Sequence, residues 1–230
     1  NLRCDERADL AALRSNAFMS LSVDQVAALS TAQIAAMTTR QIANLASPLL
    51  ASLSTRQIAA LTSIQSAALT STQATALTTA QMAAFETADL AALSTAAIFA
   101  LNSEQISALS GGQIGALITA QVAALTSDVI GALSTSQITA LSSTQKSALT
   151  TEQIGALSTA QIRIFTTGDI AALTTSEIAA LNSDQMTGLS AAQIGALTTR
   201  QIAILSTGQV ASFSTAQIVG LTATQTATFS

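Results

Sequence analysis

The side chains that could take part in catalysis are sparse and poorly grouped. Serine is abundant, but the sequence contains no histidine that could act as its base. Lys146 stands beside Ser147, and we expect this pair to be an irregularity of the sequence, not a catalytic dyad. Carboxylates such as Asp9, Asp89 and Asp169 lie far apart along the chain, so no acid–base pair is visible. We therefore expect that the protein is not an enzyme.

Metal, phosphate and nucleic-acid sites lack support as well. Cys/His clusters and Asp-x-Asp loops are missing, so we expect no cofactor and no metal. The pair Gly111-Gly112 has no lysine of a phosphate loop beside it. The 8 basic and 12 acidic residues are spread thinly and Trp and Tyr are absent, which argues against nucleic acid as a partner. The longest run of apolar residues is the six-residue stretch 96–101, which is too short to cross a membrane, so we expect no membrane span.

Two further expectations concern the ends of the chain. Cys4 is the single cysteine and cannot form an internal disulfide. We expect an isolated thiol there, with an intermolecular link or a lipid attachment near a mature N-terminus as the alternative. The chain starts at Asn1 without an initiating methionine and stops at Ser230, so we interpret it as a mature product or a fragment of a longer protein.

Glutamine is the polar side chain that returns at a fixed interval. After a leading segment, residues 1–5, the range 6–229 consists of 28 octads without insertion or deletion. With Leu13 and Leu21 at position 8, position 4 is Gln in 20 copies and position 8 is Leu in 23. Positions 1 and 2 are mostly Ser or Thr, and position 5 is mostly Ile, Val, Leu or Met. Such a short period predicts one continuous solenoid, in which each copy buries its apolar face against its neighbours.

The pattern of uniform and variable positions favours a helix in each octad. At about 100° per residue, a helix places positions 4, 5, 7 and 8 on one arc, and these are the uniform ones. A strand would place variable position 6 beside uniform positions 4 and 8. A continuous helix fails, because eight residues are not a whole number of turns. We predict an all-α solenoid of very short capped helices, one per octad, with a β-solenoid as the alternative because Thr and Ile favour strands.

The glutamine at position 4 has a predicted structural role. Ser or Thr at position 1 with Gln at position 4 forms a capping box, in which the hydroxyl and the amide each bind a free backbone N–H group. Stacked amides could also bond between successive coils as a ladder. The residues that we assign to capping or a ladder are Gln25, Gln33, Gln41, Gln57, Gln105, Gln113, Gln185 and Gln193.

Departures from the octad recur at every tenth copy. The apolar residue at position 5 is lost at Ser66, Lys146 and Thr226, and Asp9, Asp89 and Asp169 replace the glutamine at the same spacing. Duplication of an 80-residue block explains this. The geometric alternative is that ten octads complete a whole number of superhelical turns. On that hypothesis Ser66, Lys146 and Thr226 would form a polar stripe for contact between solenoids.

Phrases such as residues 77–85 and 86–93 resemble the LTTAQIAAL-type octapeptide repeats of very long bacterial secreted or surface proteins. The resemblance implies an extracellular or cell-surface location and a structural or adhesive role. It carries over no catalytic residue.

Our leading functional hypothesis is a structural repeat protein that forms or extends a surface filament, stalk or sheath by self-association. Its partner would then be another copy of itself or neighbouring repeats. The alternative is an adhesin, or a module that binds ice or carbohydrate through regular Ser/Thr rows, with a glycan or another surface ligand as partner.

Overall fold

The computed structural model describes residues 21–229, so the leading segment 1–5 and Cys4 lie outside the described part of the chain. Residues 21–229 form 26 α-helices of four to six residues and one short 3-10 helix, η1 (Ala227–Phe229). They contain no strand. Each octad of this range holds one α-helix, as the uniform positions predict. The all-α solenoid of short capped helices is therefore confirmed, and the β-solenoid alternative is wrong.

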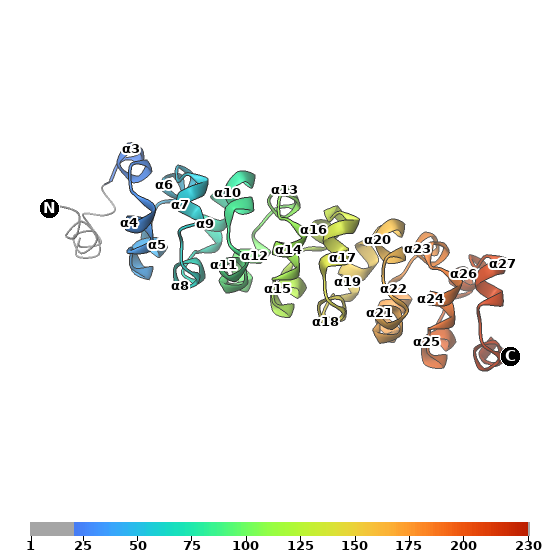
Figure 1. Ribbon diagram of the computed structural model, residues 1–230. Helices are drawn as coiled ribbons and strands as arrows, with labels where there is room; N and C mark the ends of the chain where they lie inside the picture. Colours follow the sequence, from blue (N-terminus) through green and yellow to red (C-terminus); the bar gives the residue numbers. More distant parts are fainter. Residues whose placement is uncertain (1–20, 230) are drawn as a thin grey trace. The chain divides into compact units, whose positions relative to one another are not determined.

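The chain divides into two compact units, the first ending at Leu125 and the second beginning at Thr126. Within the first unit, helices three places apart in the chain pack against each other, so three octads make one coil (Figure 1). The helices of successive coils thus form three columns. One column consists of α3 (Val23–Ala27), α6 (Ser47–Ala51), α9 (Ser71–Ala76), α12 (Thr95–Phe99) and α15 (Thr119–Ala124); the second of α4 (Thr31–Ala35), α7 (Thr55–Ile58), α10 (Thr79–Ala84) and α13 (Ser103–Ser107); the third of α5 (Thr39–Asn44), α8 (Ser63–Ala67), α11 (Thr87–Ala92) and α14 (Gly111–Gly115).

The second unit has the same three-column arrangement. One column consists of α16 (Ser127–Ala132), α19 (Thr151–Ala156), α22 (Thr175–Ala180), α25 (Thr199–Ala203) and α28 (Ala223–Thr226); the second of α17 (Thr135–Ala140), α20 (Thr159–Arg163), α23 (Ser183–Gly188) and α26 (Thr207–Ala211); the third of α18 (Ser143–Lys146), α21 (Thr167–Ala172), α24 (Ala191–Gly195) and α27 (Thr215–Val219).

Two extended residues form each corner between helices. At the corner between α5 and α6, Leu45 at position 8 has φ −65° and ψ 122°, and the following Ala46 has φ −59° and ψ 140°. Every described residue outside glycine has a negative φ, so ordinary side chains fit the corner without strain. This explains why the repeat needs no glycine or proline at a fixed position.

The core consists of the side chains at positions 5 and 8. Within the coils Ile42, Ile58 and Ile138 at position 5 are fully buried, and the leucines at position 8 are nearly so. Burying one such pair stabilises the folded chain by on the order of 3–6 kcal/mol per octad. Position 7 was predicted to share this arc, yet residues such as Ala84 and Ala92 are only half-buried. The Gln side chains at position 4 are buried with the apolar residues, which raises the question of how their polar groups are satisfied.

Candidate functional site

The side-chain oxygen of the position 4 glutamine binds the start of its own helix. In α7, Gln57 Oε1 accepts a hydrogen bond of 2.8 Å from the backbone N–H of Ser54. The backbone N–H of Gln57 donates in return to Ser54 Oγ at 3.3 Å. These two bonds form a capping box and satisfy two N–H groups that a helix end leaves free. The same box forms at each glutamine assigned from the sequence, Gln25, Gln33, Gln41, Gln57, Gln105, Gln113, Gln185 and Gln193.

The amide nitrogen of the same glutamine binds the preceding coil. Gln57 Nε2 donates to the carbonyls of Val26 and Ala27 at 3.1 and 3.2 Å, and to that of Leu29 at 2.8 Å. These carbonyls lie 28 to 31 residues back, at the C-terminal end of α3 and the corner after it, where a helix leaves carbonyl groups free. One buried side chain thus joins the N-terminal end of one helix to the C-terminal end of another.

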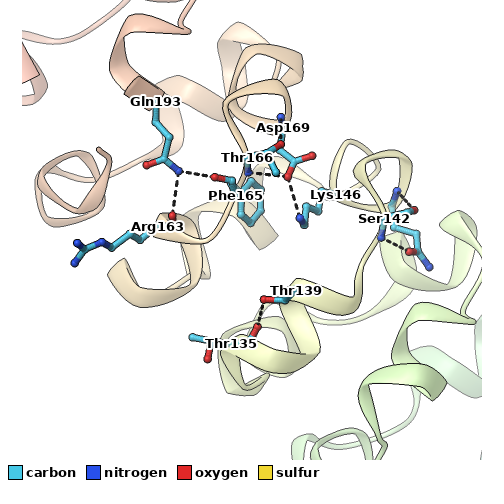
Figure 2. A network of polar contacts seen from close by, with 10 residues as sticks. Thr135, Thr139, Ser142, Lys146, Arg163, Phe165, Thr166, Asp169 and Gln193 are labelled. Atoms are coloured by element: carbon cyan, nitrogen blue, oxygen red, sulfur yellow. Dashed lines mark hydrogen bonds and ion pairs between the residues drawn. The ribbon is translucent and has the colours of Figure 1, made fainter. Parts of the chain in front are cut away.

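This bond between coils recurs through both units. The distance from Nε2 to the position 8 carbonyl stays between 2.6 and 2.9 Å in fourteen repeats. Figure 2 shows one case, in which Gln193 donates to the carbonyls of Phe165 and Arg163. In these repeats the amide binds backbone carbonyls and not another amide, which differs from the amide ladder considered from the sequence. We call this arrangement the glutamine tie.

Some octads have no side chain that can make the tie. A carboxylate or an apolar side chain at position 4 has no N–H group to give to the preceding coil. Among the described octads these residues are Leu49, Asp89, Ala97, Val129, Asp169 and Glu177. Asp89 and Asp169 differ from the others because each lies in a helix that packs against one whose apolar residue at position 5 is replaced, by Ser66 in α8 and by Lys146 in α18.

In the second unit, the exceptional residues form a buried ion pair. Lys146, in α18, lies 2.9 Å from one carboxylate oxygen of Asp169, in α21, and both side chains are nearly excluded from solvent (Figure 2). The same oxygen accepts a 2.9 Å bond from the backbone N–H of Thr166. The Lys146 ammonium also lies 5.3 Å from the centre of the Phe165 ring, within cation–π range. We call this arrangement the Lys146 site.

Contacts at the Lys146 site hold Asp169 in its charged form. Burial alone would raise the pKa of Asp169, but neighbouring Ser143, the hydrogen bonds from Lys146 and the Thr166 N–H, and the charge of Lys146 lower it to about 2. The second carboxylate oxygen, Oδ1, is buried and has no hydrogen-bond partner among the described residues.

The first unit has the equivalent site ten octads earlier, without the lysine. Asp89, in α11, accepts a 2.8 Å hydrogen bond on Oδ1 from the hydroxyl of Ser63, in α8. Asp89 Oδ2 and the Ser66 hydroxyl are both buried and have no partner among the described residues. Burial raises the pKa of Asp89, the Ser63 hydroxyl opposes this, and the charge of Glu86 raises it further, for a net increase. We call this arrangement the Ser66 site.

The predicted stripe for contact between solenoids is not supported by these positions. Ser66 is fully buried and Lys146 is 6% exposed, so another solenoid cannot reach either side chain. Thr226 is exposed, and its hydroxyl donates to the Ala223 carbonyl at 2.9 Å. Within the second unit, Lys146 belongs to the column of α18 and Thr226 to that of α28. Ten octads are not a multiple of three, so the geometric explanation of the 80-residue period is wrong.

The described residues were also compared with what a metal site and a membrane-spanning helix require. Within residues 21–229, no three His, Cys, Asp or Glu side chains converge as metal ligands. In the same range no helix combines the length and apolar character that crossing a membrane requires.

Comparison with known protein families gives the same picture of repetition. The model of the ALTTAQ repeat matches residues 6–39, 19–47, 82–119, 130–167 and 165–199, which together cover more than half of the chain. The chain belongs to the ALTTAQ repeat family. This agrees with the repeat resemblance drawn from the octads, and it makes the protein a structural repeat protein. No curated protein matches this ALTTAQ repeat chain.

Proposed function

We propose that this ALTTAQ repeat protein forms or extends a bacterial surface filament, stalk or sheath by self-association. Its location would then be extracellular or at the cell surface, and it would act without catalysis. The partner would be another copy of the chain, or further repeats of the same type.

The observation that supports this proposal is the direction of the glutamine tie. Each tie runs from an amide to a carbonyl of the preceding coil, so every coil presents donors on one side and acceptors on the other. The apolar residues at positions 5 and 8 lie between the same two coils. One coil face is therefore complementary to the opposite face of any other coil. Contacts of this head-to-tail kind produce filaments when they do not close into a ring.

Two neighbouring residues of α27 allow this contact to be tested. Ile218 occupies position 5, which is fully buried in earlier helices of its column such as α21 and α24, and it is 44% exposed. Val219 occupies position 6 and is 78% exposed. An aspartate at residue 218 would place a charge where the next coil stacks, whereas one at residue 219 would lie on the outer surface.

We expect the 230-residue chain to form oligomers of increasing length with concentration, measured by sedimentation velocity and electron microscopy. Ile218→Asp should abolish this growth, and Val219→Asp should leave it nearly unchanged. A chain that stays monomeric at all concentrations would contradict self-association. Growth lost only in Val219→Asp would mean that the copies associate side by side.

One observation favours the alternative, a surface-binding module. Thr151, Thr175 and Thr199 are exposed at the same position of the stacked helices α19, α22 and α25. Such a regular hydroxyl row is the kind of surface that could match ice or a carbohydrate. Thermal hysteresis or glycan-array binding that is lost when these three threonines become valine would support this function over self-association.

A further inference from the structure

The Ser66 site contains several buried oxygen atoms and few hydrogen-bond donors. In most repeats the two amide hydrogens of the position 4 glutamine serve the carbonyls 28 to 31 residues earlier. For Asp89 the corresponding carbonyls belong to Ile58, Ala59 and Leu61, and an ionised aspartate brings them no hydrogen. Aspartate is also one methylene shorter than glutamine, so its carboxylate stops short of the position of the amide nitrogen.

Two buried polar groups of this site have no partner in the described part of the chain. They are Asp89 Oδ2 and Ser66 Oγ, on side chains that are 3% and 0% exposed. Ser66 corresponds to Lys146, whose ammonium lies against the carboxylate of Asp169. Serine lacks most of the length of a lysine side chain. The two unpartnered groups therefore belong to the residues that correspond to Lys146 and Asp169, the partners of the ion pair in the second unit.

The charges of the two sites point to the missing component. The Lys146 site pairs one negative with one positive charge. At the Ser66 site the charge of Glu86 acts on Asp89, and no positive side chain contributes to the electrostatics of Asp89. Phe85 occupies the position of Phe165, whose ring lies near the Lys146 ammonium. Carboxylate, hydroxyl and carbonyl oxygens beside an aromatic ring are suitable neighbours for a cation.

We propose that the Ser66 site binds a monovalent cation of the size of ammonium or potassium, held by the Asp89 carboxylate, the Ser66 hydroxyl and the carbonyls at the end of α7. The bound ion takes the place of the Lys146 ammonium in the equivalent site. One positive charge balances the buried carboxylate, and the oxygen atoms replace the hydration shell. The proposal concerns the interior of the coil and does not depend on self-association.

The test compares the thermal unfolding of the full chain in potassium chloride and in tetramethylammonium chloride at equal ionic strength and pH 7. Tetramethylammonium is too large for a buried site of this kind. We expect potassium to raise the unfolding midpoint by about 2–4 °C, because an ion that binds only the folded state stabilises it. Ammonium should act in the same way.

Two matched variants separate this site from general salt effects. Ser66→Lys supplies its own ammonium and should lose the difference between the two salts. Lys146→Ser creates a second Ser66-type site and should enlarge the difference. Equal midpoints for the unchanged chain in both salts would overturn the proposal, and so would a full difference in Ser66→Lys. A response to calcium but not to potassium would also overturn it.

A crystallographic measurement keeps the proposal testable if Ser66→Lys does not fold. Crystals of the unchanged chain grown in rubidium chloride should show an anomalous peak in contact with Asp89. No such peak should lie at Asp169, where Lys146 already supplies the charge. Ordinary water density beside Asp89, with no anomalous signal, would overturn the cation assignment.

Discussion

The Lys146 and Ser66 sites occupy equivalent positions in the two units of the chain, and they differ in how a buried carboxylate is compensated. Asp169 has an ammonium group at 2.9 Å and a pKa of about 2. Asp89 has one serine hydroxyl, one unpartnered oxygen and a raised pKa. The coils around them follow the same packing pattern, so the residue at position 5 accounts for much of the difference.

This comparison explains what the regular core tolerates. An octad with Gln and Ile satisfies its own helix and the preceding coil with one amide. An aspartate at position 4 removes the N–H donors and adds a buried charge, each of which is costly without a partner. Lysine at position 5 compensates the charge, whereas serine does not. The effect of an aspartate at position 4 therefore depends on which residue replaces the apolar side chain at position 5 of the helix packed against it.

Removing the lysine should have the largest effect. Lys146→Met keeps the length of the side chain but leaves Asp169 buried without a counter-charge, so we expect a loss of about 3–5 kcal/mol in the free energy of unfolding, measured in urea at pH 7. The double variant Lys146→Ile/Asp169→Gln restores the ordinary octad residues and should recover most of this loss. A double variant as unstable as Lys146→Met would show that the ion pair is not the reason.

Substituting glutamine for each aspartate should change stability in opposite directions. Asp89→Gln restores a tie to the carbonyls of Ile58 and Leu61 and removes a buried charge, so we expect a gain of about 1–3 kcal/mol. Asp169→Gln also supplies an amide, but it leaves the Lys146 ammonium buried and unpaired, so we expect a loss. Urea denaturation of both variants measures the difference. Changes of the same sign would contradict the contrast between the sites.

Asp169 and Asp89 should make the free energy of unfolding depend on pH in opposite directions. An unfolded aspartate has a pKa near 3.8 and folded Asp169 one of about 2, so the unfolded chain binds more protons between these values. The contribution of Asp169, on the order of 1–2 kcal/mol, is present above pH 4 and is lost as the pH falls toward 2. Asp89 has a raised pKa, so its contribution is present at low pH and is lost as the pH rises through the folded value.

The pH profiles need controls that lack each carboxylate. Lys146→Ile/Asp169→Gln should lose the acid-side decrease, and Asp89→Gln should lose the decrease at higher pH. Denaturation in tetramethylammonium salts keeps the proposed cation from obscuring the contribution of Asp89. Profiles that coincide with that of the unchanged chain would contradict the assigned protonation states.

The smallest expected effect concerns the helix caps beside the two sites. Thr166 and Asp169 form a capping box, with a 3.0 Å bond from the Asp169 N–H to the Thr166 hydroxyl. Glu86 caps α11 without any side-chain bond. Glu86→Thr should therefore stabilise the chain by about 1 kcal/mol in thermal or urea unfolding. Glu86→Ala removes the same charge without adding a hydroxyl, so an equal gain in both variants would assign the effect to charge instead.

The sequence by itself determined the local structure of each repeat. Ser or Thr at position 1 and Gln at position 4 define a helix start, and Ile and Leu at positions 5 and 8 define one buried side. These pairs join residues three positions apart, so a single octad contains the information. Comparing 28 octads also separated the buried positions from the outer ones. The half-buried state of Ala at position 7 was not predicted, because a small residue fits both at a close corner and inside a core, so its type does not distinguish the two.

Only the tertiary structure decided how the octads combine. The number of octads in a coil depends on small corner angles that no period of eight encodes, and the observed value of three removes the proposed polar stripe. The second role of Gln57 and its equivalents depends on carbonyls 28 to 31 residues away. Packing between successive coils likewise brings Lys146 of α18 to Asp169 of α21, whereas Ser66 of α8, which packs against the helix of Asp89, has no partner among the described residues. Local sequence specifies the helix, whereas packing between coils determines which polar groups meet inside it.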